Sequence, residues 1–144
     1  MIATRFEEDK MTISQLTASA LAACFLFCLA TSAASAAERR TFDAKSFAAA
    51  QTSGTPVLVD ISATWCPTCK AQKPIIDSLA EQPENRDLII FAVDFDSQKA
   101  IVREFRAQSQ STLIAFRGKT ETGRSDGDTG PSSIAALVKS TLAK

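Results

Sequence analysis

The chain contains no histidine, and this absence excludes several kinds of site. Hydrolase triads built on serine or cysteine need an imidazole as general base, and most histidine-based acid/base schemes are excluded with them. A structural zinc site normally takes four Cys or His ligands. Only four cysteines are present, and two of them, Cys24 and Cys28, lie in an apolar leader. A zinc site on the remaining pair, Cys66 and Cys69, would therefore lack two ligands, which favours redox chemistry for this pair.

An excess of charge of either sign is also missing. Sixteen Lys and Arg residues balance sixteen Asp and Glu residues over 144 positions. No basic stripe is visible, so the sequence offers no support for nucleic-acid binding. Internal repeats and low-complexity linkers are absent beyond the leader, and the length predicts one small globular domain with an additional segment at its N-terminus.

Charged residues are missing from Met11 to Ala37. The apolar core of this segment is followed by small residues, and Ala34-Ser35-Ala36 fits the small-x-small pattern of a signal peptidase site. We therefore predict a secretory signal over residues 1–37, cleaved near Ala36 or Ala37, and a folded domain over residues 38–144.

Two alternatives for the leader stay open. Its apolar stretch approaches the length of about 20 residues that a membrane-spanning helix needs, so residues 1–37 could remain as an N-terminal anchor. The segment Leu21-Ala22-Ala23-Cys24 is similar to a bacterial lipobox, which would place a lipid on Cys24. Cleavage, anchoring and lipidation all predict that the residues after Ala37 lie outside the cytosol.

The residues that carry chemistry form one short segment, Trp65-Cys66-Pro67-Thr68-Cys69-Lys70. Two thiols separated by two residues can close a disulfide within one helical turn. At a helix N-terminus, unpaired N–H groups and the macrodipole favour a thiolate and lower a cysteine pKa from about 8.5 to roughly 3.5–7.5. We expect Cys66 to be the attacking sulfur, and Cys69, one turn further on and less exposed, to resolve the mixed disulfide.

Apolar patterning around this segment predicts alternating strands and helices. Near-continuous apolar runs predict buried strands over residues 57–61, 88–95 and 112–116, and turn residues predict an exposed edge strand over 119–125. Helical spacing predicts a helix capped by Asp43 and ending near Gly54, a second one through residues 75–79, a short one around 101–105 and a final one over 134–141. Pro74 lies inside the second helix, where it should produce a kink.

Together these residues resemble the thioredoxin family over about residues 40–143. The resemblance rests on Val57-Leu58-Val59-Asp60, the Trp65–Lys70 segment, Pro74, Val93-Asp94-Phe95-Asp96, Thr112-Leu113 and Gly118. It implies an α/β thioredoxin-like fold, with a central mixed sheet flanked by helices on both faces. It also implies thiol-disulfide exchange on protein disulfide substrates, with no cofactor or metal beyond the redox-active Cys66–Cys69 disulfide.

The resemblance implies a proton-transfer role for Asp60. In the family, an aspartate at this place lies buried behind the second cysteine, and burial raises the pKa of a carboxyl so that it can act as a base near neutral pH. A strand-end aspartate bonded to nearby backbone is the alternative. Many thioredoxins place a lysine near this carboxylate, at the position that is Ala92 here. We therefore expect Asp60 to ionise less easily.

A substrate groove is implied around the dithiol, with Trp65, Pro67 and Thr68 on one side and Ser111 and Thr112 on the other. The family typically has a cis-proline at the position of Ser111. A cis Gln110–Ser111 bond would cost about 2.5–4 kcal/mol, so we expect either a strained loop or a trans bond with a different groove. A serine here could place its hydroxyl against Cys66.

The function that this reasoning favours is an exported disulfide reductase, similar to periplasmic thioredoxin-like proteins of bacteria. Such a protein is expected to be a monomer that receives electrons from an integral-membrane thiol donor. A disulfide oxidase or isomerase is the alternative with the same chemistry, and it requires a more stable thiolate. A Cu(I)-binding module on Cys66 and Cys69 is the alternative of another class. No methionine or histidine follows residue 37 to complete such a copper site.

Overall fold

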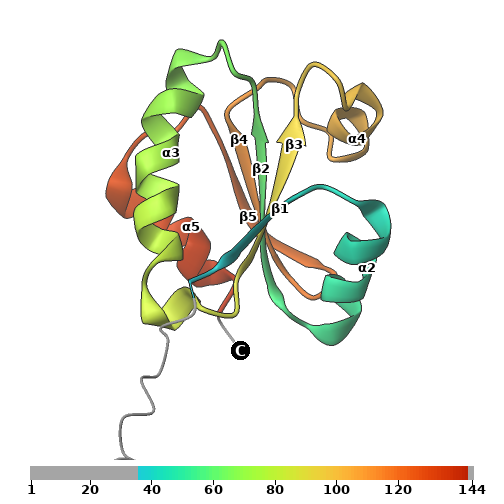
Figure 1. Cartoon of the computed structure of the whole chain (residues 1–144), viewed down its shortest axis with the longest axis vertical. Coiled ribbons are helices and arrows are strands. Elements are labelled where there is room, and N and C mark those ends of the chain that lie inside the picture. The colour runs from blue at the N-terminus through green and yellow to red at the C-terminus, as the bar shows by residue number, and fades with distance from the viewer. Residues whose placement is uncertain (1–35, 143–144) are drawn as a thin grey trace, which may run out of the picture. The chain divides into compact units, whose positions relative to one another are not determined.

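A computed structural model describes residues 36–142 of the chain (Figure 1). Its centre is a sheet with the strand order β1-β3-β2-β4-β5. The strands are β1 (Glu38–Thr41), β2 (Pro56–Ser62), β3 (Ile89–Asp94), β4 (Thr112–Arg117) and β5 (Thr120–Asp126). β1 and β2 run parallel to β3, whereas β4 runs antiparallel to β2 and β5. The expected mixed sheet is therefore confirmed.

Helices cover both faces of this sheet. They are α2 (Ala44–Ser53), α3 (Pro67–Ala80), α4 (Lys99–Glu104) and α5 (Pro131–Ser140), with a short 3₁₀ helix, η1 (Pro83–Asn85), after α3. In Figure 1, α3 and α5 lie on one side of the sheet and α2 and α4 on the other. This arrangement confirms the predicted thioredoxin-like α/β fold.

The two faces of β2 explain the layers. A strand points successive side chains to opposite faces. Val57, Val59 and Ile61 belong to the apolar cluster under α2 and α4, whereas Leu58 belongs to the cluster under α3 and α5. By the same alternation Asp60 points toward α3. The alternation along β2 thus places the Asp60 carboxyl beneath α3, the helix with Cys66 and Cys69 at its N-terminus.

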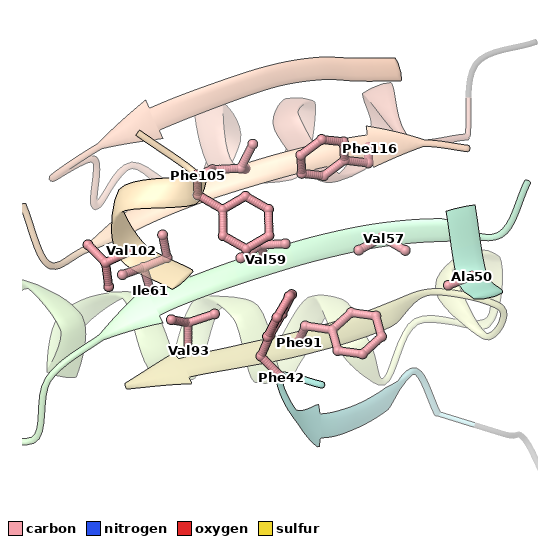
Figure 2. Close-up of a cluster of buried hydrophobic side chains, with 11 residues drawn as sticks. Phe42, Ala50, Val57, Val59, Ile61, Phe91, Val93, Val102, Phe105 and Phe116 are labelled. Atoms are coloured by element: carbon pink, nitrogen blue, oxygen red, sulfur yellow. The ribbon is translucent and has the colours of Figure 1, made fainter. Parts of the chain in front are cut away.

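The cluster under α2 and α4 is rich in aromatic rings (Figure 2). Phe42 packs edge-on against Phe91 and Phe105, with ring centroids 5.9 and 5.4 Å apart. Phe47 and Phe116 complete the ring contacts. Edge-to-face packing of this kind stabilises a core beyond the area that it buries. The cluster under α3 and α5 is aliphatic and consists of Leu58, Ile76, Leu79, Leu88, Ile90, Leu113, Ile134 and Val138.

The sequence did not predict β1. The segment Glu38-Arg39-Arg40-Thr41 has no apolar alternation, because it forms an edge strand whose side chains are mostly exposed. Its order comes from parallel pairing with β3, in which Arg39 lies beside Ile90. The other predicted strands and helices are present within two or three residues of their expected bounds, apart from the long helix, which begins well before residue 75.

The predictions for the leader are not tested by the structure, because Cys24 and nearly all of residues 1–37 lie outside the described residues. The predicted cleavage site, anchor and lipidation therefore remain predictions, as does the domain boundary at residue 38. Between residues 36 and 142, no helix has both the length and the apolar character needed to cross a membrane.

Candidate active site

Cys66 and Cys69 lie where the chain passes from β2 into α3. Cys66 is the N-cap of α3, and its Sγ accepts the backbone N–H of Cys69 at 3.1 Å. Pro67 follows as the first helical residue, where the missing N–H costs nothing. The Cα atoms of Cys66 and Cys69 are 5.3 Å apart, and the two sulfurs form a disulfide. The helix N-terminus thus supplies N–H groups to the sulfur expected to carry negative charge.

Exposure does not separate the two sulfurs in the expected order. Cys66 is 1% exposed and Cys69 is 8% exposed, so the expectation that Cys69 is the less exposed residue is wrong. Both cysteines belong to a small buried cluster with Ala63, and the half-buried Phe95 packs against this cluster. The observation that favours Cys66 as the attacking sulfur is therefore its position at the helix N-terminus and not its exposure.

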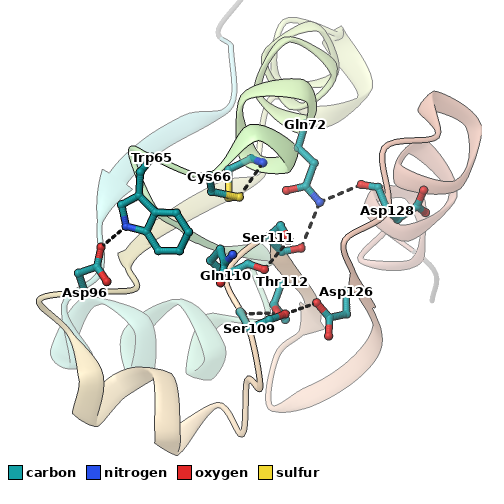
Figure 3. The surroundings of a disulfide bond; sticks show 11 residues. Trp65, Cys66, Gln72, Asp96, Ser109, Gln110, Ser111, Thr112, Asp126 and Asp128 are labelled. Atoms are coloured by element: carbon teal, nitrogen blue, oxygen red, sulfur yellow. Dashed lines mark hydrogen bonds between the residues drawn. A yellow bond between two sulfur atoms is a disulfide. The ribbon is translucent and has the colours of Figure 1, made fainter.

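Trp65 is the exposed apolar side chain beside the disulfide (Figure 3). It is 55% exposed, and its Nε1 donates to Asp96 Oδ2 at 2.7 Å. Lys99 lies 3.6 Å from the other oxygen of Asp96. The indole is thus held at one edge while its surface is left open. Pro67 is exposed beside it, and Thr68 is half-buried.

Asp60 lies on β2 behind the second cysteine. It is 8% exposed and lines a cleft of about 310 Å³ together with Cys69, Lys70, Lys73 and Asp94. Burial raises the pKa of the Asp60 carboxyl, and the nearby Arg39 guanidinium opposes this shift. The hydrogen-bond partner of the carboxylate is the Arg39 side chain, which gives the alternative of a backbone-bonded aspartate no support.

Arg39 is a residue of this site that the sequence did not predict. Its Nη1 donates to Asp60 Oδ2 and its Nη2 to Asp77 Oδ1, both at 3.0 Å. Asp77 is also paired with Lys73 one turn earlier on α3, and these contacts lower the pKa of Asp77. The guanidinium reaches Asp60 from β1, across β3, where the small Ala92 lies opposite Asp60. Arg39 therefore supplies a cation near Asp60, although the residue at position 92 is an alanine and not a lysine.

The Ser111 loop lies at the same end of the molecule as Trp65 and Cys66 (Figure 3). Every peptide bond between residues 36 and 142 is trans, so Gln110–Ser111 has the trans form that was one of the two expected alternatives. Ser111 has a φ of 66°, in the left-handed region. Its hydroxyl donates to the Gln110 carbonyl, and a contact with Cys66 stays a prediction. The Thr112 hydroxyl donates to the Ser109 carbonyl at 2.8 Å and is also turned into the loop.

Gln72 joins this loop to α3, and the sequence analysis did not single it out. It lies three residues after Cys69, on the buried face that continues through Ile76 and Leu79. Its Nε2 donates to the carbonyls of Ser111 and Asp128. A glutamine at a position where helical spacing demands an apolar side chain was the available signal.

The remaining predicted residue, Pro74, is exposed within α3. The helix continues past it to Ala80 without the hydrogen bond that a residue with an N–H would donate to the Lys70 carbonyl. The kink at Pro74 stays a prediction. Over the described part of the chain, no three Cys, Asp or Glu side chains are grouped so as to hold a metal ion.

Comparisons with known proteins agree on the family. The thioredoxin family model matches residues 38–140. The bifunctional thioredoxin reductase/thioredoxin of Mycobacterium leprae is 36% identical over 92 residues, which are 64% of this chain but only 20% of that protein. The thioredoxin of Mycolicibacterium smegmatis is 34% identical and covers 62% of this chain and 81% of its own length.

Among solved structures, Trxlp from Edwardsiella tarda EIB202 matches with a TM-score of 0.68. It is 44% identical and covers 70% of this chain and 98% of its own. The region that the family model matches, residues 38–140, contains both cysteines, Asp60 and the Ser111 loop. The fold, the motif and the relatives therefore indicate the same chemistry, thiol-disulfide exchange.

Proposed function

Because this chain belongs to the thioredoxin family and is a thiol-disulfide oxidoreductase, we propose that it is an extracytoplasmic disulfide reductase that acts on protein substrates. The observation that carries the proposal is the position of Cys66 as N-cap of α3, disulfide-bonded to Cys69, in front of the buried Asp60. This arrangement supplies a nucleophile, a resolving thiol and a base in one place.

The cycle begins with the reduced dithiol. The Cys66 thiolate attacks one sulfur of a substrate disulfide, a mixed disulfide forms, and the other substrate sulfur leaves as a thiolate. Cys69 then attacks Sγ of Cys66, which releases the second substrate sulfur and closes the Cys66–Cys69 disulfide. Two electrons and two protons pass to the substrate, and the disulfide of the structure is the oxidised product.

Asp60 is proposed to accept the proton of Cys69 before the second attack. A base for this step works best when its pKa lies near the pH at which it acts, so that it accepts a proton and later releases it. Asp60 is buried, and burial raises the pKa of its carboxyl in this direction. The cleft that Asp60 shares with Cys69 is a route by which water can carry the proton between them.

The cell location and the electron source are part of the proposal. The uncharged segment from Met11 to Ala37 supports export to the bacterial periplasm, with residues 1–37 cleaved or kept as an anchor. A reductase there needs a supply of electrons, for which we propose an integral-membrane thiol donor. We propose that the domain acts as a monomer.

The test is the reduction potential of the Cys66–Cys69 pair, measured on the purified full chain in dithiothreitol or glutathione buffers. Trp65 is the only tryptophan and lies next to Cys66, so its fluorescence follows this pair and not Cys24 or Cys28. A potential near or below about −230 mV supports a reductase. A value near about −120 mV would favour an oxidase and overturn the proposal.

Metal titration of the reduced protein separates the remaining alternative. Tight, stoichiometric Cu(I) binding by Cys66 and Cys69, together with an inability to reduce insulin, would replace the reductase by a copper-binding module. Reduction of insulin that the Cys66→Ser variant lacks supports the reductase.

A further inference from the structure

Gln72 occupies an unusual position for an amide side chain. It is fully buried on α3, three residues beyond Cys69, and its Nε2 donates to the Ser111 carbonyl at 3.1 Å and to the Asp128 carbonyl at 2.8 Å. These two bonds use both hydrogens of the amide. Figure 3 shows the side chain reaching from the helix to the two loops. One side chain thus joins three segments that surround the disulfide.

The Ser111 loop requires such support. A residue with a side chain rarely adopts a positive φ, and the surrounding structure must hold it there. The Ser111 carbonyl accepts a second bond from the Gly127 N–H at 3.0 Å, and Ser109 is bonded to Asp126. These contacts tie the loop to β5 and its exit. Gln72 supplies the tie to the dithiol helix.

The Gln72 side chain also contains an energetically unfavourable feature. Oε1 of Gln72 is buried and has no hydrogen-bond partner among the described residues. A buried polar atom without a partner is unfavourable, so an apolar residue would suit this helix face better unless the two donated bonds matter. The neighbours Ile76 and Leu79 on the same face are apolar, which makes Gln72 the exception.

We propose that Gln72 is a positioning residue that fixes the Ser111 and Asp128 loops against the dithiol helix, and so sets the affinity of the groove for extended protein substrates. In this chain an amide from α3 holds the loop that a rigid proline would otherwise shape. The proposal rests on the proposed reductase function, because it concerns how the substrate is held during thiol-disulfide exchange.

The test compares two disulfides of different size with the full chain and its variants. Reduced protein is mixed with insulin or with bis(2-hydroxyethyl) disulfide, and oxidation of the pair is followed by Trp65 fluorescence. A polypeptide such as insulin must bind along the groove before it reacts, whereas the small disulfide has to reach only the sulfurs of Cys66 and Cys69. Gln72→Met removes both donated bonds at similar volume, and Gln72→Asn keeps the amide but shortens it by one methylene.

We expect Gln72→Met to raise the apparent KM for insulin about tenfold, equivalent to about 1.4 kcal/mol, while its limiting rate changes less than about twofold. Gln72→Asn should lie between wild type and Gln72→Met, and neither variant should change the reaction with the small disulfide. Amide hydrogen exchange should become faster at residues 109–112 and 127–130 in both variants. Gln72→Asn keeps the test decisive if Gln72→Met does not fold.

Asn85 offers a matched control. It is buried in η1, beyond the far end of α3, and its Nδ2 donates to the Leu79 carbonyl at 2.8 Å. Asn85→Leu removes a bond of the same kind and should lower stability without raising the KM for insulin. An unchanged KM in the Gln72 variants, or an equal rise in Asn85→Leu, would overturn the role of Gln72. Failure of the wild type to react with insulin would instead overturn the proposed reductase.

Discussion

Removal of the Arg39 guanidinium tests the electrostatics of the buried carboxyl most directly. Arg39 Nη1 lies 3.0 Å from Asp60 Oδ2, and Arg39 also contacts Asp77. Arg39→Met keeps most of the aliphatic stem and removes the charge. The variant therefore leaves Asp60 buried without its cation, and the pKa of Asp60 should rise further above its ordinary value.

The size of this effect follows from the exposure of the pair. Two unit charges about 4 Å apart attract by about 1 kcal/mol in water and by about 4 kcal/mol at an effective dielectric constant of about 20. The Arg39 side chain is 33% exposed and that of Asp60 is 11% exposed. Solvent screening therefore favours an intermediate value of about 2 kcal/mol, and loss of this attraction should raise the pKa of Asp60 further.

The sign of the pH dependence follows from the raised pKa. The native state binds the Asp60 proton more tightly than the unfolded chain does, so the free energy of unfolding falls as pH rises from the unfolded pKa of about 3.9 to the folded pKa. Arg39→Met extends this window upward. Urea unfolding at pH 4 to 8 should show a loss relative to wild type that grows with pH by up to about 2 kcal/mol.

Two controls separate this effect from other contacts of Arg39. Asp77 has a lowered pKa, so the stability that it gains from its pair with Arg39 is present above the unfolded pKa of about 3.9 and changes little between about pH 5 and pH 8. Asp77→Asn removes a negative charge that raises the pKa of Asp60, and its effect on this pKa should have the opposite sign. A difference between Arg39→Met and wild type that is the same at pH 4 and pH 8 would refute the reasoning.

Two further predictions concern the groove. Ser111→Gly should be more stable than Ser111→Ala by about 1 kcal/mol in urea unfolding, because both lose the hydroxyl and only glycine accepts a φ of 66° without strain; equal stabilities would show that the loop relaxes. Trp65→Ala should change the free energy of unfolding by less than about 0.5 kcal/mol, since the indole is exposed. It should nevertheless raise the KM for insulin several-fold in a turbidity assay, and an unchanged KM would exclude Trp65 from the substrate surface.

The parts of the site that the sequence predicted are those with local causes. The apolar run of β2 followed directly by Trp65–Lys70 is enough to place two thiols at a helix N-terminus, since strand, cap and helix are adjacent in sequence. Burial of Asp60 follows from its place inside that run. These predictions needed neighbours only a few residues away.

The parts that it did not predict depend on contacts between distant segments. Arg39 is 21 residues from Asp60 and meets it only because β1 pairs with the far edge of β3. Gln72 is 39 residues from Ser111 and 56 from Asp128. The buried cluster of Ala63, Cys66 and Cys69 is likewise packed against Phe95, which directly follows β3. Spacing within one element carries no information about such pairs.

The position of Arg39 connects the predicted export step with the chemistry. Cleavage after Ala36 or Ala37 would leave Arg39 as the third or second residue of the mature chain. Two backbone bonds hold the start of β1, from the Ala37 nitrogen to the Ala80 carbonyl at 2.8 Å and from the Glu38 nitrogen to the Leu88 carbonyl at 3.0 Å. Cleavage after Ala36 would keep both bonds, and cleavage after Ala37 would keep only the second. Ala80 is the last residue of α3 and Leu88 lies directly before β3, so bonds of this kind hold the start of β1 beside the helix toward which Asp60 points. A cut only a few residues later would remove the cation that opposes the rise in the pKa of Asp60. Cleavage after Ala36 or Ala37 would therefore leave Arg39, and with it the cation beside Asp60, in the mature chain.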